Sequence, residues 1–153
     1  MNGQFDSRAP AELEAPALHD SVRPLFIPVH SENDLAVVAA SVGAFASERT
    51  RDPVHLARIR IAALELATNV VKYAKRGRVE IRVLVQGSRE AIELIVSDRG
   101  PGIADVALAL QDHYSSGGTL GLGLPGVKRM MDEFELHSSA ELGTTVRVRK
   151  WLR

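Results

Sequence analysis

The sequence predicts one α/β domain in which a sheet packs against helices as a two-layer sandwich. Its 153 residues, 45% of them hydrophobic, are enough for a single core. Apolar residues recur at helical spacing over 34–49 and 53–74. They alternate with polar residues, as half-buried strands do, over 78–86, 91–98 and 144–152. The apolar faces of these helices and strands must be buried against each other.

Charge and composition exclude several classes of protein. The 19 basic residues equal the 19 acidic ones, so no bulk charge attracts nucleic acid or a membrane surface. The chain has no cysteine, which excludes disulfides and thiolate metal sites, and its five histidines lack the spacing of a zinc site. No run approaches the roughly 18 apolar residues of a membrane span, and no apolar signal segment opens the chain. We expect a cytoplasmic protein.

The first 24 residues are predicted to be a flexible arm, and residues 25–153 a single folded domain. Residues 1–24 contain three prolines and show no sustained period. The domain opens with a short strand over 25–29. Pro28 cannot donate a backbone hydrogen bond, so we expect this strand at an edge of the sheet.

Two helices come next. Ser31 or Asn33 is expected to cap the helix over 34–49, whose apolar side packs into the core. Asp52, followed by a proline, opens a longer helix that we expect to reach about Ala74. A turn of about 100° per residue leaves one polar stripe on this helix. The stripe consists of Glu65, Thr68, Asn69 and Lys72. Taken alone it is typical of a solvated face, and a functional face is the alternative.

The strand over 91–98 carries a carboxylate on its apolar face. Ile92, Leu94 and Val96 share one side, and Asp98 continues their alternation. A carboxylate on an inward face is costly unless it accepts hydrogen bonds. Asp98 should therefore meet protein N–H groups or a donor on a ligand.

The final strand offers two threonines to the same region. Thr144 shares the face of Val146 and Val148, whereas Thr145 lies on the opposite face. Parity with the apolar residues favours Thr144, and both stay as candidates.

The glycine-rich stretch from Asp98 to Gly126 is expected to be the centre of the functional site, and the rest of the chain is expected to position it. A predicted helix over 124–134 would direct its positive N-terminal end at this stretch. Glycines supply tight turns and bare N–H groups, which suit an anionic ligand such as a phosphate. Residues 105–119 are predicted to form a mobile lid. The glycines are Gly100, Gly102, Gly117, Gly118, Gly121, Gly123 and Gly126.

Two common phosphate-binding loops do not fit this stretch. Residues 121–126 match the dinucleotide fingerprint G-x-G-x-x-G. A Rossmann loop follows a strand at the start of a βαβ unit, whereas this one follows a polar loop broken by glycines. A Walker loop ends in Gly-Lys-Ser/Thr, but Gly126 is followed by Val127 and Lys128.

Three motifs remain in order: ELATN at 65–69, DRGPG at 98–102 and GLGL at 121–124. In this combination the chain resembles the Bergerat-fold (GHKL) ATPases, the superfamily that includes gyrase, Hsp90, histidine kinases and MutL. Within it, the stretches ELATNVVKYA, DRGPGI, GLGLPGVKRMMDEFEL, GTTV and RKW resemble the anti-sigma serine/threonine kinases, in their switch-kinase branch. The resemblance covers about residues 25–152. It implies a mixed, mainly antiparallel sheet with helices on one face and nucleotide between the layers.

The resemblance also implies roles for single residues. Asn69 would give its side-chain oxygen to Mg²⁺, and Glu65, one turn earlier, would be the general base. Asp98 would accept the adenine amino group, Gly102 would let the base approach the backbone, and Thr144 would assist. Amides after residue 120 would hold the phosphates. The residues expected to bind ATP are Asn69, Lys72, Asp98, Gly100, Gly102, Gly121, Leu122, Gly123, Leu124 and Thr144.

The implied function is an ATP-dependent serine/threonine protein kinase. Its phosphoacceptor would be a small antagonist protein with a STAS domain, the domain of sulfate transporters and anti-sigma antagonists. A sigma factor or a PP2C-type phosphatase are further partners that the family implies, and a homodimer stays open. Nucleic acid and membranes are not expected partners.

Two departures from the family pattern keep alternatives open. Residues 114–120 carry no basic residue, although some family members have one in the lid, so contacts to the γ-phosphate would be weaker or would come from Lys72 or Lys128. The chain also lacks the dimerisation helices and phosphoacceptor histidine of a sensor kinase. The main alternative is an ATP-binding regulatory module, an anti-sigma factor or phosphatase activator with little phosphotransfer. An ATP hydrolase that drives conformational change is less favoured, because no transducer domain is visible.

Overall fold

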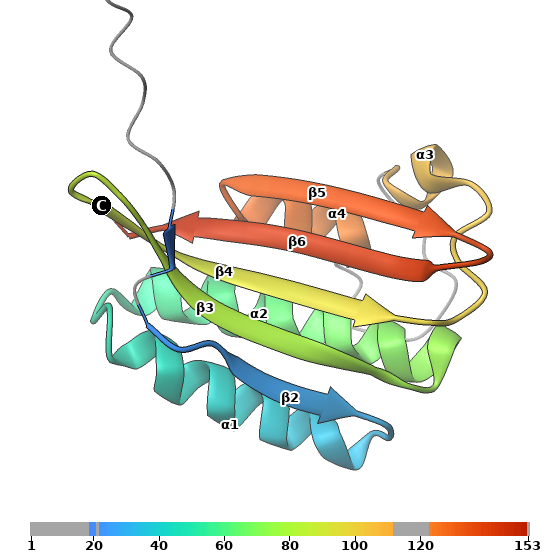
Figure 1. Cartoon of the computed structure of the whole chain (residues 1–153), viewed down its shortest axis with the longest axis horizontal. Helices are drawn as coiled ribbons and strands as arrows, with labels where there is room; N and C mark the ends of the chain where they lie inside the picture. Colours follow the sequence, from blue (N-terminus) through green and yellow to red (C-terminus); the bar gives the residue numbers. More distant parts are fainter. Residues whose placement is uncertain (1–18, 21, 112–122, 153) are drawn as a thin grey trace, which may run out of the picture.

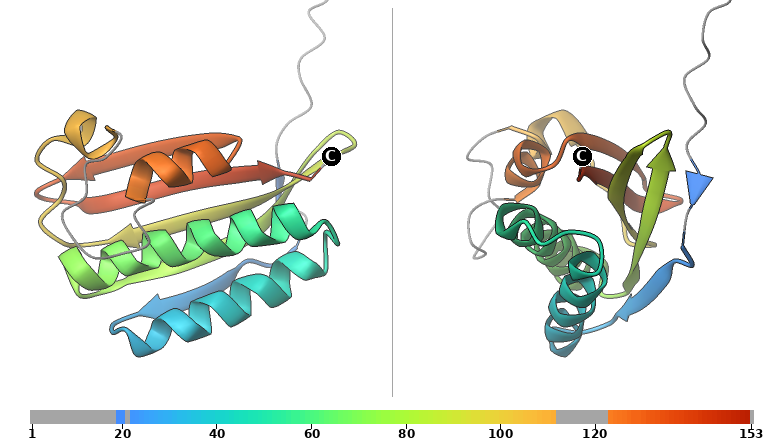
Figure 2. Two further views of the ribbon diagram at one scale, coloured as in Figure 1. Left: turned by 180° about the vertical axis from the view of Figure 1, so that it is seen from behind. Right: turned by 90° about the vertical axis from the view of Figure 1, so that its left-hand side faces the viewer.

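The fold is a two-layer sandwich of one sheet and a layer of helices. The structure, a computed structural model, describes residues 19–20, 22–111 and 123–152. Three helices, α1, α2 and α4, cover one face of the sheet, and no described helix lies on the other face (Figures 1 and 2). The helices are α1 (Asn33–Ser47), α2 (Pro53–Asn69), η1 (Val70–Ala74), α3 (Val106–Ala109) and α4 (Gly123–Met130).

The sheet is antiparallel at every pairing between described strands. Its order is β1-β3-β4-β6-β5, and β2 pairs with β3 on the same side as β1. The strands are β1 (His19–Asp20), β2 (Leu25–Val29), β3 (Gly77–Gln86), β4 (Arg89–Asp98), β5 (Glu133–Ser139) and β6 (Gly143–Trp151). The predicted sandwich with a mainly antiparallel sheet is therefore confirmed. The pair His19–Asp20 lies inside the stretch 1–24 expected to be an arm, and it is bonded to β3.

The core lies between the sheet and the helix layer. Alternate residues of β3, β4 and β6 point to the helices and are buried there, as their period-2 pattern predicts. On the sheet side these residues are Val79, Ile81, Val83, Ile92, Leu94, Val96, Val146 and Val148. On the helix side they include Val38, Val42, Ile59, Ala62, Ala63 and Leu66. None of the described helices is long and apolar enough to cross a membrane.

The two long helices begin in different ways. The Asp52 cap of α2 is confirmed, since Oδ1 accepts from the N–H groups of Val54 at 2.8 Å and His55 at 3.4 Å. The expected Ser31 or Asn33 cap of α1 is wrong. Glu32 occupies the N-cap position without a side-chain cap bond.

Asp34 takes over the local hydrogen bonding at the start of α1. Its Oδ2 accepts from the N–H of His30 at 2.7 Å and from that of Ser31 at 3.1 Å. An aspartate in the first helical turn reaches back to the preceding loop, so Ser31 is a donor here and not a cap.

The helix predicted over 124–134 is too long. Helix α4 ends at Met130, and the chain continues as β5, a strand that the periodicity reading missed. Asp132 explains the break, because its N–H donates to the carbonyl of Arg149 at 2.9 Å. Its carboxylate accepts from the N–H of Trp151 at 2.7 Å and from Nζ of Lys150 at 3.0 Å. These contacts attach the chain to β6 and start a ladder.

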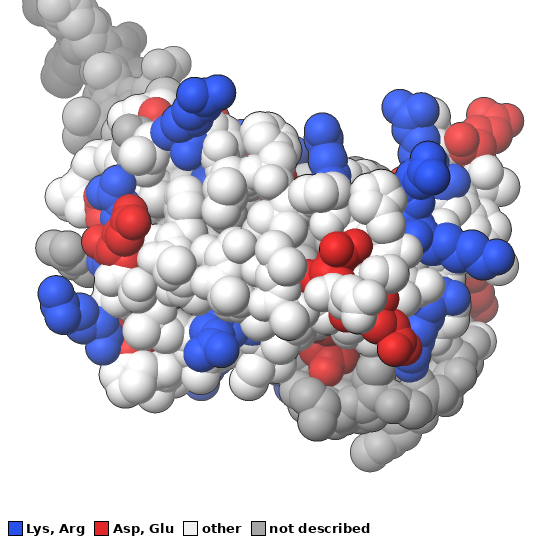
Figure 3. Space-filling model, turned by 90° about the horizontal axis from the view of Figure 1, so that it is seen from below, with Lys and Arg blue, Asp and Glu red and all other residues white. Residues whose placement is uncertain are grey.

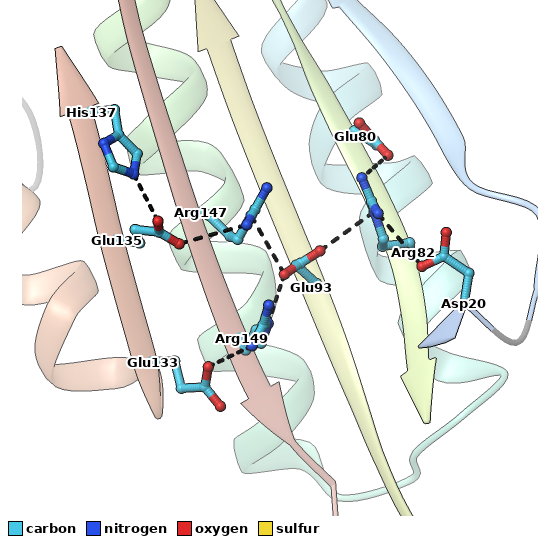
Figure 4. Close-up of polar contacts among 9 residues, drawn as sticks. All are labelled: Asp20, Glu80, Arg82, Glu93, Glu133, Glu135, His137, Arg147 and Arg149. Atoms are coloured by element: carbon cyan, nitrogen blue, oxygen red, sulfur yellow. Dashed lines mark hydrogen bonds and ion pairs between the residues drawn. The ribbon is translucent and has the colours of Figure 1, made fainter. Parts of the chain in front are cut away.

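The open face of the sheet carries a network of charged side chains centred on Glu93 (Figure 4). Glu93 is 2% exposed, and its Oε1 accepts from Nε of Arg149 at 2.7 Å. Nε of Arg82 lies 3.4 Å from Oε2, and Nε of Arg147 lies 3.7 Å from Oε1. Glu133 pairs with Arg149 at the edge of this network. The three guanidinium groups cover the carboxylate and compensate its burial.

We predict that Glu93→Gln lowers the free energy of unfolding by roughly 1–3 kcal/mol, because three guanidinium groups lose their shared buried charge. Urea unfolding at fixed pH measures this loss. Glu133→Gln is the matched control: its carboxylate is 45% exposed, and it should cost less than about 1 kcal/mol. Equal losses in the two variants would contradict a central role for Glu93.

Candidate active site

The predicted site residues gather at one end of the sandwich. The last turns of α2 and η1, the end of β4, the start of β6 and the first turn of α4 meet there (Figure 2). Of the expected residues, Gly121 and Leu122 lie outside the described part of the chain, as does most of the predicted lid. The other expected residues come from these five segments and from the loop after β4, which carries Gly100 and Gly102.

Glu65 is buried on α2. The prediction that its polar stripe is a solvated face is therefore wrong at this residue. Its exposed fraction is 4%, although two of its stripe neighbours, Thr68 and Asn69, are only half-buried. The carboxylate accepts a hydrogen bond from the backbone N–H of Gly123, the first residue of α4. Burial raises the pKa of Glu65, and the Gly123 bond and the charge of Lys72 lower it less than burial raises it. A carboxyl group with a raised pKa binds a proton more tightly than an ordinary glutamate, which suits a general base.

Asn69 stands one helical turn after Glu65, at the junction with η1. The chain continues there as a single π-turn, in which the N–H of Lys75 donates to the carbonyl of Val70 at 2.8 Å. Lys75 adopts a left-handed conformation, with φ of 65°, and ends the helix. Lys72 lies on the exposed side of this turn. The sequence predicted a helix to Ala74 but gave no sign of the wider turn.

Asp98 accepts hydrogen bonds from two backbone N–H groups. Its Oδ1 lies 2.8 Å from the N of Gly100 and 3.3 Å from the N of Thr144. The prediction that this half-buried carboxylate needs donors is thus met by the protein itself. Among the described contacts Oδ2 accepts none, so one oxygen remains for a ligand donor.

Close backbone packing fixes the segment around Asp98. A Cβ at Gly100 would lie 2.6 Å from the Cβ of Ala74, and one at Gly77 would lie 2.5 Å from the carbonyl of Ser97. These contacts press η1 against the end of β4. Gly102, with φ of 77°, has no room for a Cβ because the carbonyl of Ser139 lies 2.6 Å away. Its lack of a side chain is therefore needed for packing on the β5–β6 hairpin.

Thr144 joins the hairpin to the loop after Asp98. Its Oγ1 lies 2.8 Å from Oγ of Ser138, which also accepts from the N–H of Ile103 at 2.7 Å. Thr144 shares the parity of the buried Val146 and Val148, whereas Thr145 pairs with residues of the open face. Ser138 belongs to the strand that sequence reasoning missed, so its role at this site was missed too.

The first turn of α4 faces Glu65. Gly123 has φ of 52°, a left-handed conformation that favours glycine. Leu124 is 8% exposed and belongs to the core, so only its backbone is available to a ligand. A helix N-terminus whose N–H already binds a carboxylate is a suitable donor for phosphate oxygens.

Comparison with known proteins identifies the class. The model of the "Histidine kinase-like ATPase domain" family matches residues 28–150. This match spans most of the chain, which therefore belongs to the histidine kinase-like (GHKL) ATPase family. The described fold agrees with it.

Two curated relatives narrow the class. The chain is 45% identical over 100 residues to serine/threonine-protein kinase RsbT of Bacillus subtilis, covering 65% of this chain and 75% of that protein. It is 31% identical over 117 residues to an anti-sigma F factor of a Thermoanaerobacter species, covering 72% and 80% of the two chains. A solved sensor histidine kinase, mycobacterial MprB, aligns with a TM-score of 0.49 at 20% identity, covering 84% of this chain and 96% of that one.

The buried Glu65 gives a pH prediction for the ligand-free protein. Because its pKa is raised on folding, the native state keeps a proton that the unfolded chain loses above about 4.5, the ordinary value. The proton on Glu65 therefore stabilises the fold below that pH, and this contribution is lost as pH rises through the raised pKa. Glu65→Gln has no such titrating group. The unfolding free energy of the variant minus that of wild type should therefore increase as pH rises.

Urea unfolding across this pH range measures the effect, and Glu135→Gln is the control of opposite sign. The hydrogen bond from His137 lowers the pKa of Glu135, so its charged form stabilises the fold above about 4.5 and less as pH falls. Its effect should be small, because the group is exposed. A stability gap between wild type and Glu65→Gln that does not change with pH would contradict the raised pKa.

Proposed function

We propose that this protein is an ATP-dependent serine/threonine kinase of the partner-switching type, whose phosphoacceptor is a STAS-type antagonist protein. The observation that carries the proposal is Glu65. It is a buried carboxyl group with a raised pKa, one helical turn before Asn69 and in contact with the N-terminus of α4. The relatives named serine/threonine-protein kinase and anti-sigma F factor support the same reading. A sigma factor or a PP2C-type phosphatase would be the further partner of such a switch.

The residues present fit a nucleotide. The free oxygen of Asp98 is an acceptor for the adenine amino group, at the end of the site away from α4. The N–H of Gly123 would be a donor for a phosphate oxygen, and the hydrogen bond that it gives to the Glu65 carboxyl group supports this role. Asn69 would hold Mg²⁺ through its side-chain oxygen, and the metal would neutralise the charge of the phosphates.

The transfer requires one base and one leaving group. The acceptor hydroxyl of the partner gives its proton to a carboxylate oxygen of Glu65 while its oxygen attacks the γ-phosphorus. The bond from this phosphorus to the bridging oxygen breaks, and ADP leaves with the electron pair. Burial of Glu65 excludes water from the base and raises its affinity for the proton.

An ATP-binding regulatory module with little phosphotransfer is the second candidate, and one contact favours it. The Glu65 carboxylate accepts from Gly123, the same N–H group that would bind phosphate. A phosphate that takes this N–H would remove a hydrogen bond that holds the Glu65 carboxylate in place. The two candidates differ in phosphotransfer and agree in nucleotide binding.

The first test is nucleotide binding. Isothermal calorimetry should show saturable binding of Mg-ATP to the wild-type chain. Asp98→Asn should weaken binding by about 1–3 kcal/mol, because a charge-assisted contact to adenine is lost. Glu141→Gln, an exposed carboxylate on the neighbouring hairpin, should bind like wild type. A wild-type chain that binds no ATP at millimolar nucleotide would overturn both candidates.

The second test separates the kinase from the regulatory module. Glu65→Ala should keep nucleotide affinity close to wild type but lower phosphotransfer by roughly 10²–10⁴, the contribution of a positioned base. Asn69→Ala should lose both metal-dependent binding and transfer, because Mg²⁺ loses an oxygen ligand. The measurement is transfer of the labelled γ-phosphate to the STAS-type protein recovered with the chain from native lysate.

Two outcomes of this experiment would change the conclusion. If Glu65→Ala transfers phosphate as fast as wild type, Glu65 is not the base. If wild type binds the partner and ATP but transfers nothing, the regulatory module is correct.

A further inference from the structure

Four exposed basic residues form a rim at the end of the sandwich, beside the candidate site. They lie just after η1, at the start of β3 and just after β4, and we call them the basic rim: Lys75, Arg76, Arg78 and Arg99. Figure 3 shows Lys and Arg side chains gathered at the right-hand end of the lower face. The rim lies outside the residues that the proposed kinase mechanism uses.

The sheet register brings the rim together. Gly77 pairs with Asp98 at the end of the β3–β4 ladder, so Arg76, just before Gly77, and Arg99, just after Asp98, lie at the same end of the sheet. Like charges that are neighbours on a sheet repel. Within the described residues, neither arginine forms an ion pair with a carboxylate.

The open face of the same sheet shows the contrast. There Arg82, Arg147 and Arg149 each pair with at least one carboxylate, and they share the buried Glu93 (Figure 4). A chain with no net charge has enough acidic residues to pair its cations. At the rim the local carboxylate of Asp98 is instead bonded to backbone N–H groups.

Apolar side chains stand next to the rim. Leu142, in the β5–β6 turn, is 81% exposed, and the next residue, Gly143, packs on the backbone of Arg99. The guanidinium of Arg78 lies 5.2 Å above the ring of Phe26, which is 51% exposed. Arginine beside exposed aromatic and apolar side chains is typical of protein interfaces.

We propose that the basic rim is a docking surface for an acidic segment of a protein partner, with Leu142 and Phe26 as its apolar contacts. Charge complementarity selects this occupant, because the rim offers four cations, and the carboxylate of Asp98 beside them already accepts two backbone N–H groups. A neutral chain with exposed apolar side chains at the rim suits a protein better than a nucleic acid. The surface does not depend on phosphotransfer.

The test uses a short fluorescein-labelled peptide that combines Asp and Glu with Leu and Phe, and the full-length chain. Fluorescence anisotropy should show binding that weakens as salt is raised. The same peptide with Asn and Gln in place of its acids should bind at least about tenfold more weakly. Arg76→Glu with Arg99→Glu should weaken binding of the acidic peptide about tenfold or more, whereas Arg76→Lys with Arg99→Lys should keep most of it.

The matched control is Arg51→Glu with Arg58→Glu, which makes the same change in net charge at exposed positions near the start of α2, at the opposite end. It should bind the acidic peptide within about twofold of wild type, and thermal melts check that each variant is folded. Equal weakening by the two charge reversals would overturn the proposal, as would equal affinity for both peptides. Tighter, rim-dependent binding of a single-stranded oligonucleotide would identify a nucleic-acid surface instead.

Discussion

The carboxylate of Asp98 is the contact on which the end of the sandwich depends. It accepts the N–H of Gly100 in its own loop and that of Thr144 on β6, so one oxygen atom ties the end of β4 to the start of β6. The glycines around it remove the side chains that would prevent this approach. At Gly143, the position of a Cβ is already occupied by the backbone of Asp98 and its neighbour. The segments that carry the other candidate residues pack on this junction.

Helix α2 reaches the same junction through its last turns. Ala74 lies against Gly100, so the helix that carries Glu65 and Asn69 is held in register with the strand that carries Asp98. The site thus has two ends, one at Asp98 and the other where Glu65 meets Gly123 of α4. Two ends of this kind suit an elongated ligand, such as a nucleotide with its adenine at one end and its phosphates at the other. Burial of the Glu65 carboxyl group costs free energy when it is charged, and strongly perturbed groups of this kind are common at functional sites.

Charged side chains are arranged differently on the open face of the sheet and at the end of the β3–β4 ladder. On the open face, a buried Glu93 gathers arginines from two neighbouring strands, and further carboxylates at the edges complete the pairing. Arg76 and Arg99 lie together at the end of the β3–β4 ladder, and neither forms an ion pair with a carboxylate of the described residues. The network around Glu93 stabilises the sheet. The basic rim places positive charge beside the candidate site, where it could bind an acidic partner.

Local chemistry decided much of this fold from the sequence alone. The Asp52–Pro cap, the alternation in β3, β4 and β6 and the demand of Asp98 for donors each depend on neighbours within a few residues, and each agrees with the structure. The three motifs also identified the family, because their residue types, in this order, are those expected for binding a single nucleotide. Gly100 and Gly102 indicated that another part of the molecule comes close to the backbone there. They did not indicate that the neighbours would be Ala74 and Ser139.

Tertiary contacts decided the rest. The chain after Met130 leaves the helix because Asp132 bonds to β6, nearly twenty residues further on, and no local pattern contains that partner. Glu65 is buried because α4 packs over its stripe, although the stripe taken alone resembles a solvated face. The sequence by itself determined which residues are available for a nucleotide site. Only the folded chain decided which of them are buried, which backbone groups they meet and which cations are left without a carboxylate, because burial and pairing depend on segments that are distant in sequence.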